Sequence, residues 1–365
     1  MGTAPASAEP IQSAPAQPRP AHDIPSLDGL RAISIGLVIL SHTKSLLPSP
    51  IANSGMFRYV IGGGLHGVQV FFVISGYLIT TLLLREYNRT GTVSFKRFYA
   101  RRALRIFPPF YVYFAVLAIL WVMGIIPEHW PTYLASATYT FIYLPNPHGS
   151  YVEHAWSLSI EEQFYLLWPA LLLFAHRRAK SIPLALAIIA LMPIVRTVLY
   201  LTAPSPERVI ITSSSADTLM VGCLLALLRN CAVGQRMHRR FLNAWTAAVL
   251  LATGFLLVPY LSTKLTGIAA IADVALGNTV TALCIGGILI YVTDNSQSPA
   301  GRFLNLRLIR HLGVISYSLY LWQQIFTGNS AHMRPYVYLC MLIAAELSFW
   351  LIEKPIMQLR TCLNL

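Results

Sequence analysis

The sequence predicts an all-α protein, a polytopic membrane helix bundle with about ten transmembrane helices. Apolar residues make up 55% of the 365 residues and charged residues only 11%, whereas a typical soluble domain has about 25% charged residues. Apolar stretches of about 20 residues recur along the chain, and each is long enough to cross a hydrocarbon core of about 30 Å. Lipid offers no hydrogen-bond partners, so these stretches are expected to be helices.

Three regions are expected along the chain. Residues 1–25 are rich in Ala, Pro, Ser and Gln, which is typical of a disordered cytoplasmic tail. A membrane domain is expected over residues 26–357, and a short cytoplasmic tail over 358–365. The stretch 132–145 is short and semi-polar, so we interpret it as an interfacial or re-entrant segment. The predicted spans are 30–48, 65–85, 106–126, 156–176, 182–202, 215–229, 242–262, 266–293, 308–327 and 335–353.

The basic residues determine the predicted orientation. With the N-terminus inside, most of the 27 Lys and Arg residues fall in or beside cytoplasmic loops, as the positive-inside rule requires. Both termini are therefore expected in the cytoplasm. The same bias explains the net charge of +13, and the lack of aromatic-basic interleaving argues against a nucleic-acid partner. The five cysteines have no metal-ligand spacing, and no metal is predicted.

Ionisable residues inside spans are costly and usually functional. Arg31 and His42 lie eleven positions apart in the first span, so a helix places them on one face, about 16.5 Å apart along its axis. An imidazole there can act as a general base near neutral pH. The alternative is a structural histidine that is hydrogen-bonded between helices.

A second polar group lies on the span that begins near Trp156. Ser157 and Glu161 are four positions apart and share a face. We expect Glu161 at a depth broadly similar to that of His42, where its carboxylate could orient the imidazole as in a catalytic dyad. The alternative is that Glu161 pairs with arginine only to stabilise packing.

Two further positions are candidates for ligand binding. Arg102 and Arg105 share a face at the predicted cytoplasmic start of a helix, and guanidinium groups bind phosphates well. An ordinary positive-inside anchor is the alternative. Ser75 and Gly76 lie in an apolar span, where small residues let a helix or a ligand chain approach closely. Helix packing is the alternative for this pair.

Six stretches in this order resemble the acyltransferase-3 family of membrane O-acyltransferases. The resemblance covers about residues 24–357, and Arg31 and His42 carry its Arg-x10-His spacing. The matching stretches are SLDGLRAISIGLVILSH, GVQVFFVISGYLI, RRALRIFPPFY, HAWSLSIEEQFYLLWP, SADTLMVG and LGVISYSLYLW.

The resemblance implies a reaction and a set of site residues. Acyl-CoA, with acetyl-CoA as the default, would donate the acyl group from the cytoplasm to a hydroxyl of a surface polysaccharide, glycolipid or related acceptor. The resemblance implies that His42 is the essential catalytic residue, with Arg31 beside it, and that Glu161 belongs to the site. Our mechanistic hypothesis makes Glu161 the second catalytic residue, which orients His42. The residues assigned to ligand binding are Arg31, Ser75, Arg102, Arg105, Trp156 and Ser157.

The resemblance and the charges leave further expectations. Family members often have His where this chain has Gln323. Some members carry a fused extracytoplasmic domain, and for this chain we expect any such activity in a separate partner protein. A multi-pass location in the cell membrane, surrounded by the lipid bilayer, is expected. The alternative function is a proton-coupled transporter that uses the same residues, with Asp217 and Asp273 as further intramembrane acids.

Overall fold

The computed structural model describes residues 25–44, 47–55, 57, 64–127, 130–144, 151–203, 206–327 and 336–362. All regular secondary structure within these residues is helical, and they contain no strand. The tail predicted over residues 1–25 lies outside the described residues except for Pro25, the first residue of α1. A proline is tolerated in the first turn of a helix because its missing N–H would be unpaired there anyway.

The long helices are α1 (Pro25–His42), α4 (Leu65–Thr90), α5 (Phe95–Val122), α7 (Ala155–His176), α8 (Ser181–Thr202), α9 (Pro206–Arg229) and α13 (Ile268–Asp294). Two more contain a π-helical turn: α11 (Ala244–Ala252) continues through η4 (Thr253–Leu257) into α12 (Val258–Ser262), and α17 (Tyr336–Ser348) continues through η6 (Phe349–Glu353) into α18 (Lys354–Cys362). The shorter helices are α2 (Ser49–Ala52), α6 (Trp130–Ala137), η3 (Phe141–Tyr143), α10 (Ala232–Phe241), α14 (Pro299–Leu304), α15 (Arg307–Val314) and α16 (Ser316–Thr327).

Among the described residues, six helices are long and apolar enough to cross a membrane, or seven if the bent pair α9 and α10 forms one span. The predicted spans 30–48, 156–176 and 308–327 correspond to α1, α7 and the pair α15–α16, which are not among these helices. Ionisable side chains lower the mean hydropathy of α1 and α7, and α16 has only 12 residues, fewer than the roughly 20 that a span needs.

The stretch 132–145 agrees with the prediction that it does not cross the membrane. It forms the eight-residue helix α6 and the single turn η3. An eight-residue helix is about 12 Å long, well short of a hydrocarbon core of about 30 Å.

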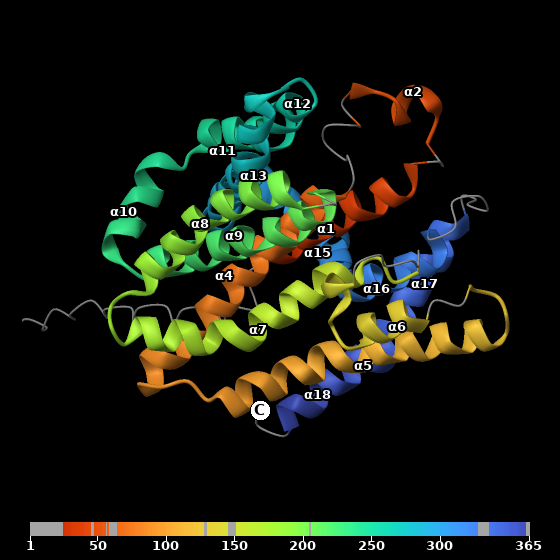
Figure 1. Ribbon diagram of the computed structural model, residues 1–365. Helices are drawn as coiled ribbons and strands as arrows, with labels where there is room; N and C mark the ends of the chain where they lie inside the picture. The colour runs from red at the N-terminus through yellow and green to blue at the C-terminus, as the bar shows by residue number, and fades with distance from the viewer. Residues whose placement is uncertain are drawn as a thin grey trace, which may run out of the picture.

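Helix α4 occupies the centre of the bundle (Figure 1). It packs against α9 and α1, and α9 in turn packs against α8 and α13; α7 contacts α4 from below in this view, and α5 lies beyond α7. Its C-terminus is at Thr90, because Gly91 adopts φ +72° and donates its N–H to the Tyr87 carbonyl, as glycine commonly does after a helix.

The α4–α9 contact depends on two glycines. A Cβ atom on Gly76 would overlap the backbone of Leu219, and a Cβ atom on Gly222 would overlap the backbone of Val73. Small residues at such positions let two membrane helices approach closely. The packing interpretation therefore holds for Gly76.

Candidate active site

A cavity of about 100 Å³ lies between α1, α4, α5, α7 and α16. It brings together most of the residues predicted for the site, from helices far apart in the sequence. Those lining it are Arg31, Ser75, Arg102, Arg105, Ser157 and Glu161. His42 and Trp156 are not among its lining residues. Within the described part of the chain, no group of three or more His, Cys, Asp or Glu residues could hold a metal ion.

Glu161 is held at one wall of the cavity by two hydroxyl groups. Its carboxylate accepts hydrogen bonds from Ser75 on α4 and from Tyr165, one turn further along α7. The two hydroxyl oxygens are themselves 2.5 Å apart. Ser75 therefore belongs to a polar network at the site, whereas its neighbour Gly76 serves helix packing.

The two arginines of α5 face the cavity without a carboxylate partner. Arg102 lies over the ring of Tyr165, 5.0 Å from its centroid, a distance typical of a cation–π contact. Neither Arg102 nor Arg105 forms an ion pair with any carboxylate among the described residues. Arg101, on the other face of α5, instead donates to Glu86 at 3.3 Å. The cavity therefore has positive charge available for an anionic ligand.

Arg31 supplies a third guanidinium group to the cavity. Its Nη1 donates to Asp28 Oδ1 at 2.8 Å, one turn earlier on α1. Asp28 lies in the first turn of the helix, where a carboxylate interacts favourably with the helix dipole. This pair neutralises part of the charge of Arg31 and fixes the direction of its side chain.

His42 is the last residue of α1 and not, as the predicted span 30–48 implied, a residue inside the helix. Its Nδ1 lies 2.9 Å from the Val38 carbonyl, one turn earlier on α1, which also accepts a hydrogen bond from the Ser41 hydroxyl. A carbonyl only accepts hydrogen bonds, so Nδ1 carries the hydrogen of the neutral ring and Nε2 is left as the acceptor. An imidazole in this tautomer can take a proton through Nε2.

The contact predicted between His42 and Glu161 is not present. No hydrogen bond joins these two described side chains, since Glu161 bonds to Ser75 and Tyr165 and His42 bonds to Val38. Glu161 lines the same cavity as Arg31, and His42 lies about 16.5 Å further along α1. Glu161 therefore belongs with Arg31 and not with His42.

The start of α7 also lines the cavity. Ser157 donates to the His154 carbonyl at 3.0 Å, and its hydroxyl lies 2.5 Å from that of Tyr320 on α16. Trp156 instead packs its ring edge-on against Phe72, with the centroids 6.2 Å apart. Ser157 is therefore a cavity residue, and Trp156 is a packing residue of the adjacent core.

Sequence reasoning missed two tyrosines of the site. Tyr165 follows Glu161 by four residues, so its place on the same helix face could have been read from the spacing. Tyr320 lies on α16, 163 residues after Ser157, and no local pattern connects the two. Both hydroxyl groups complete hydrogen bonds that the predicted residues make.

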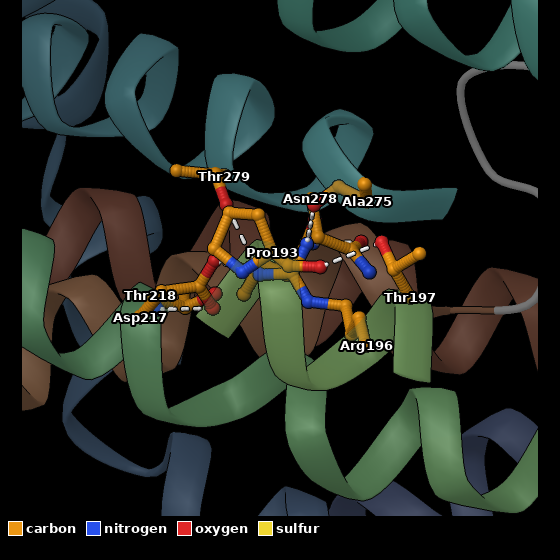
Figure 2. A network of polar contacts seen from close by, with 9 residues as sticks. Pro193, Arg196, Thr197, Asp217, Thr218, Ala275, Asn278 and Thr279 are labelled. Atoms are coloured by element: carbon orange, nitrogen blue, oxygen red, sulfur yellow. Dashed lines mark hydrogen bonds and ion pairs between the residues drawn. The ribbon is translucent and has the colours of Figure 1, made fainter. Parts of the chain in front are cut away.

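Asp217, which the sequence left as a lone intramembrane acid, has a buried partner away from the cavity. Figure 2 shows it beside Arg196, and both side chains are fully buried. Arg196 also donates to the Ala275 carbonyl at 2.6 Å, and the Thr279 hydroxyl donates to Asp217 at 2.5 Å. This network connects α8, α9 and α13, and the sequence could not show it because the partners are on different helices.

Comparisons with known proteins agree with this architecture. The family model for acyltransferase 3 proteins, described as an acyltransferase domain, matches residues 24–352. Peptidoglycan O-acetyltransferase OatA of Listeria monocytogenes is 32% identical to the chain, over 91% of the chain and 56% of that relative. O-acetyltransferase OatA of Staphylococcus aureus is 28% identical, over 91% of the chain and 57% of that relative. The chain thus spans little more than half the length of these relatives, and no solved structure matches it.

Proposed function

The chain belongs to the acyltransferase 3 family of integral membrane acyltransferases, and from this premise we propose that it transfers an acetyl group from cytoplasmic acetyl-CoA to a hydroxyl of a cell-surface glycan. The observation that carries the proposal is the cavity into which Arg31, Arg102 and Arg105 converge, with His42 on the same helix as Arg31. The printed names of the relatives, which are peptidoglycan and other O-acetyltransferases, support acetyl as the group and a glycan as the acceptor.

The arginines are proposed to hold the donor. Arg102 and Arg105 have no carboxylate partner among the described residues, and guanidinium groups bind phosphate oxygens strongly. A cavity of about 100 Å³ has room for the acyl end of the donor but not for its nucleotide. The phosphates would therefore stay at the cytoplasmic mouth while the thioester arm extends along α1 toward His42.

His42 is proposed as the general base. Its Nε2 would take the proton of the acceptor hydroxyl as the hydroxyl oxygen attacks the thioester carbonyl. A C–O ester bond forms, the C–S bond breaks, and CoA leaves as a thiolate that recovers the proton from the imidazolium. The Nδ1–H donated to the Val38 carbonyl supports this role, because it fixes the ring and its tautomer.

Glu161 is proposed to act on the donor side of the site. Its carboxylate lies in one cluster with Ser75, Tyr165 and Arg102. A negative charge there offsets part of the charge of Arg102 and holds the tyrosine on which the guanidinium group rests. Glu161 is thus a positioning residue for donor binding and not the partner that orients His42.

The membrane topology is proposed to include ten spans with both termini in the cytoplasm. Helices α1, α7 and the pair α15–α16 would cross the membrane in addition to the more apolar helices. Arg31 on α1 and Glu161 on α7 face the cavity inside the protein, which supports this placement because ionisable groups in spans avoid lipid. The membrane domain is proposed to extend over residues 26–357, with the Arg102 end of the cavity facing the cytoplasm.

No contact among the described residues specifically supports the alternative function, a proton-coupled transporter. A transport route needs ionisable groups that are free to exchange protons or a substrate. Asp217 is ion-paired with Arg196, and Glu161 is hydrogen-bonded to Ser75 and Tyr165. These contacts favour structural and positioning roles for both acids.

The proposal is tested by chemical comparison of surface glycans from cells with and without the protein. Mild alkali releases ester-linked acetate, which is quantified by chromatography and referred to total glycan. We expect ester-linked acetate to be lost without the protein and restored by the wild-type chain but not by His42→Ala. Full restoration by His42→Ala would overturn the assignment of His42, and unchanged acetate without the protein would overturn the glycan acceptor.

A further inference from the structure

A set of buried polar groups beside the cavity has no hydrogen-bond partner. Both ring nitrogens of His154 and both amide atoms of Gln323 are unpaired among the described residues, and so is the indole nitrogen of Trp322. His154 is only 3% exposed and Gln323 is fully buried. Buried polar groups are normally paired, and each exception needs an explanation. A ligand that supplies the missing partners is one such explanation.

Aromatic contacts place these groups together. The Tyr113 ring centroid is 5.4 Å from that of His154 and 5.6 Å from that of Trp322. The His154 ring is also 5.6 Å from Tyr320, which lines the cavity. Gln323 follows Tyr320 by three residues on α16, so it lies about one turn further on a neighbouring face. The unpaired groups therefore lie next to the Ser157–Tyr320 pair, whose two residues line the cavity.

These groups are uncharged donors and acceptors, so they suit a hydroxyl-bearing ligand better than a charged one. Burial, together with a smaller contribution from the nearby His42 ring, lowers the pKa of His154 to about 3. His154 is therefore neutral near pH 7 and offers one N–H donor and one nitrogen acceptor. Gln323 adds an amide donor and acceptor, and Trp322 adds a donor. Hydroxyl groups both donate and accept, which matches this uncharged set, whereas phosphate oxygens match the arginines of the donor site.

We propose that His154, Gln323 and Trp322 bind the hydroxyl groups of a sugar unit of the acceptor, next to the base His42. This inference rests on the proposed acetyl transfer and adds the place and the chemical class of the acceptor. His154 accepts or donates a hydrogen bond to a hydroxyl and keeps its own proton throughout. The proton released in the transfer goes to His42, so His154, Gln323 and Trp322 bind the acceptor and take no part in proton transfer.

The experiment uses the full chain in lipid nanodiscs, with acetyl-CoA as donor and a soluble oligosaccharide of N-acetylglucosamine and N-acetylmuramic acid as the acceptor probe. Initial rates are measured against each substrate for the wild type, His154→Phe and Gln323→Met. Phenylalanine keeps the ring that packs on Tyr113 and Tyr320, and methionine keeps the length of glutamine. His238→Phe is the matched control, because His238 is buried on α10 and its Nε2 has no described partner either.

The expected result is a KM for the oligosaccharide that rises roughly tenfold or more in both site variants, as the loss of a hydrogen bond to a substrate hydroxyl produces. The KM for acetyl-CoA stays unchanged, and so do both KM values in His238→Phe. The melting temperature of the site variants stays equal or rises, because unpaired polar atoms have been removed from the interior.

Each contrary outcome has a separate meaning. A lower melting temperature with unchanged KM values would make His154 and Gln323 packing residues and overturn the inference. An equal rise in the KM for both substrates would overturn it as well, since the acceptor site would not be separate. If the wild-type protein transfers no acetyl group to any hydroxyl, the proposed function itself fails, and the inference fails with it.

Discussion

The Arg196–Asp217 pair gives a sharp test of the distinction between structural and functional charges. Asp217→Asn keeps the shape of the side chain and removes its charge. In the structure this carboxylate accepts hydrogen bonds from Arg196, from the Thr279 hydroxyl and from the Thr218 N–H, with both charged side chains fully buried. Removing one partner of a buried pair leaves the other charge uncompensated, which costs about 3–5 kcal/mol.

The assay is thermal unfolding of the purified protein in nanodiscs, together with the acetyl-transfer rate per folded molecule. We expect Asp217→Asn to lower the melting temperature markedly while the transfer rate at low temperature stays near that of the wild type, because the pair does not line the cavity. The double variant Arg196→Met/Asp217→Leu should regain much of the lost stability, since no unpaired charge remains. An unchanged melting temperature combined with abolished transfer would contradict a structural role for the Arg196–Asp217 pair and make Asp217 a functional acid.

Three further outcomes follow from the site and the packing. Arg102→Ala should raise the KM for acetyl-CoA roughly tenfold through the loss of a charge-assisted contact, whereas Arg101→Ala, whose guanidinium pairs with Glu86 outside the cavity, should leave it unchanged in the same kinetic assay. Glu161→Gln should raise the KM for acetyl-CoA more than it lowers kcat, and a loss of kcat alone would instead support a role in proton transfer. Gly76→Val should separate α4 from α9 and prevent accumulation of folded protein in membranes, while Gly36→Val, where a Cβ meets no atom within 4 Å, should accumulate normally on immunoblots.

Local periodicity predicted the parts of the site that lie within one helix. Arg31 and His42 share α1, and Arg102 and Arg105 both line the cavity while Arg101 faces away. Helical spacing alone determines such relations. The all-helical architecture followed in the same way from the apolar stretches, because only paired backbone groups are stable in lipid.

Relations between helices could not be predicted from the sequence. Glu161 bonds to Ser75, 86 residues earlier on α4, and no periodicity indicates such a pairing. The expected relation between Glu161 and His42 relied on similar depth alone, and depth along a helix axis does not determine which side chains meet. The polar side chains of α1 and α7 make these helices less apolar than ordinary spans. The residues that form the site therefore lower the hydropathy by which membrane spans are recognised.

We propose that the chain transfers acetyl from acetyl-CoA with His42 as the base. The most direct measurement is CoA release by the purified protein in nanodiscs, with and without an acceptor glycan, for the wild type, His42→Ala and the control His311→Gln. His311 is a partly exposed histidine paired with Glu346 at 2.5 Å, away from the cavity. We expect acceptor-dependent CoA release by the wild type and by His311→Gln. We expect none by His42→Ala, although that variant remains folded. Acceptor-dependent release by His42→Ala at the wild-type rate would contradict this proposal.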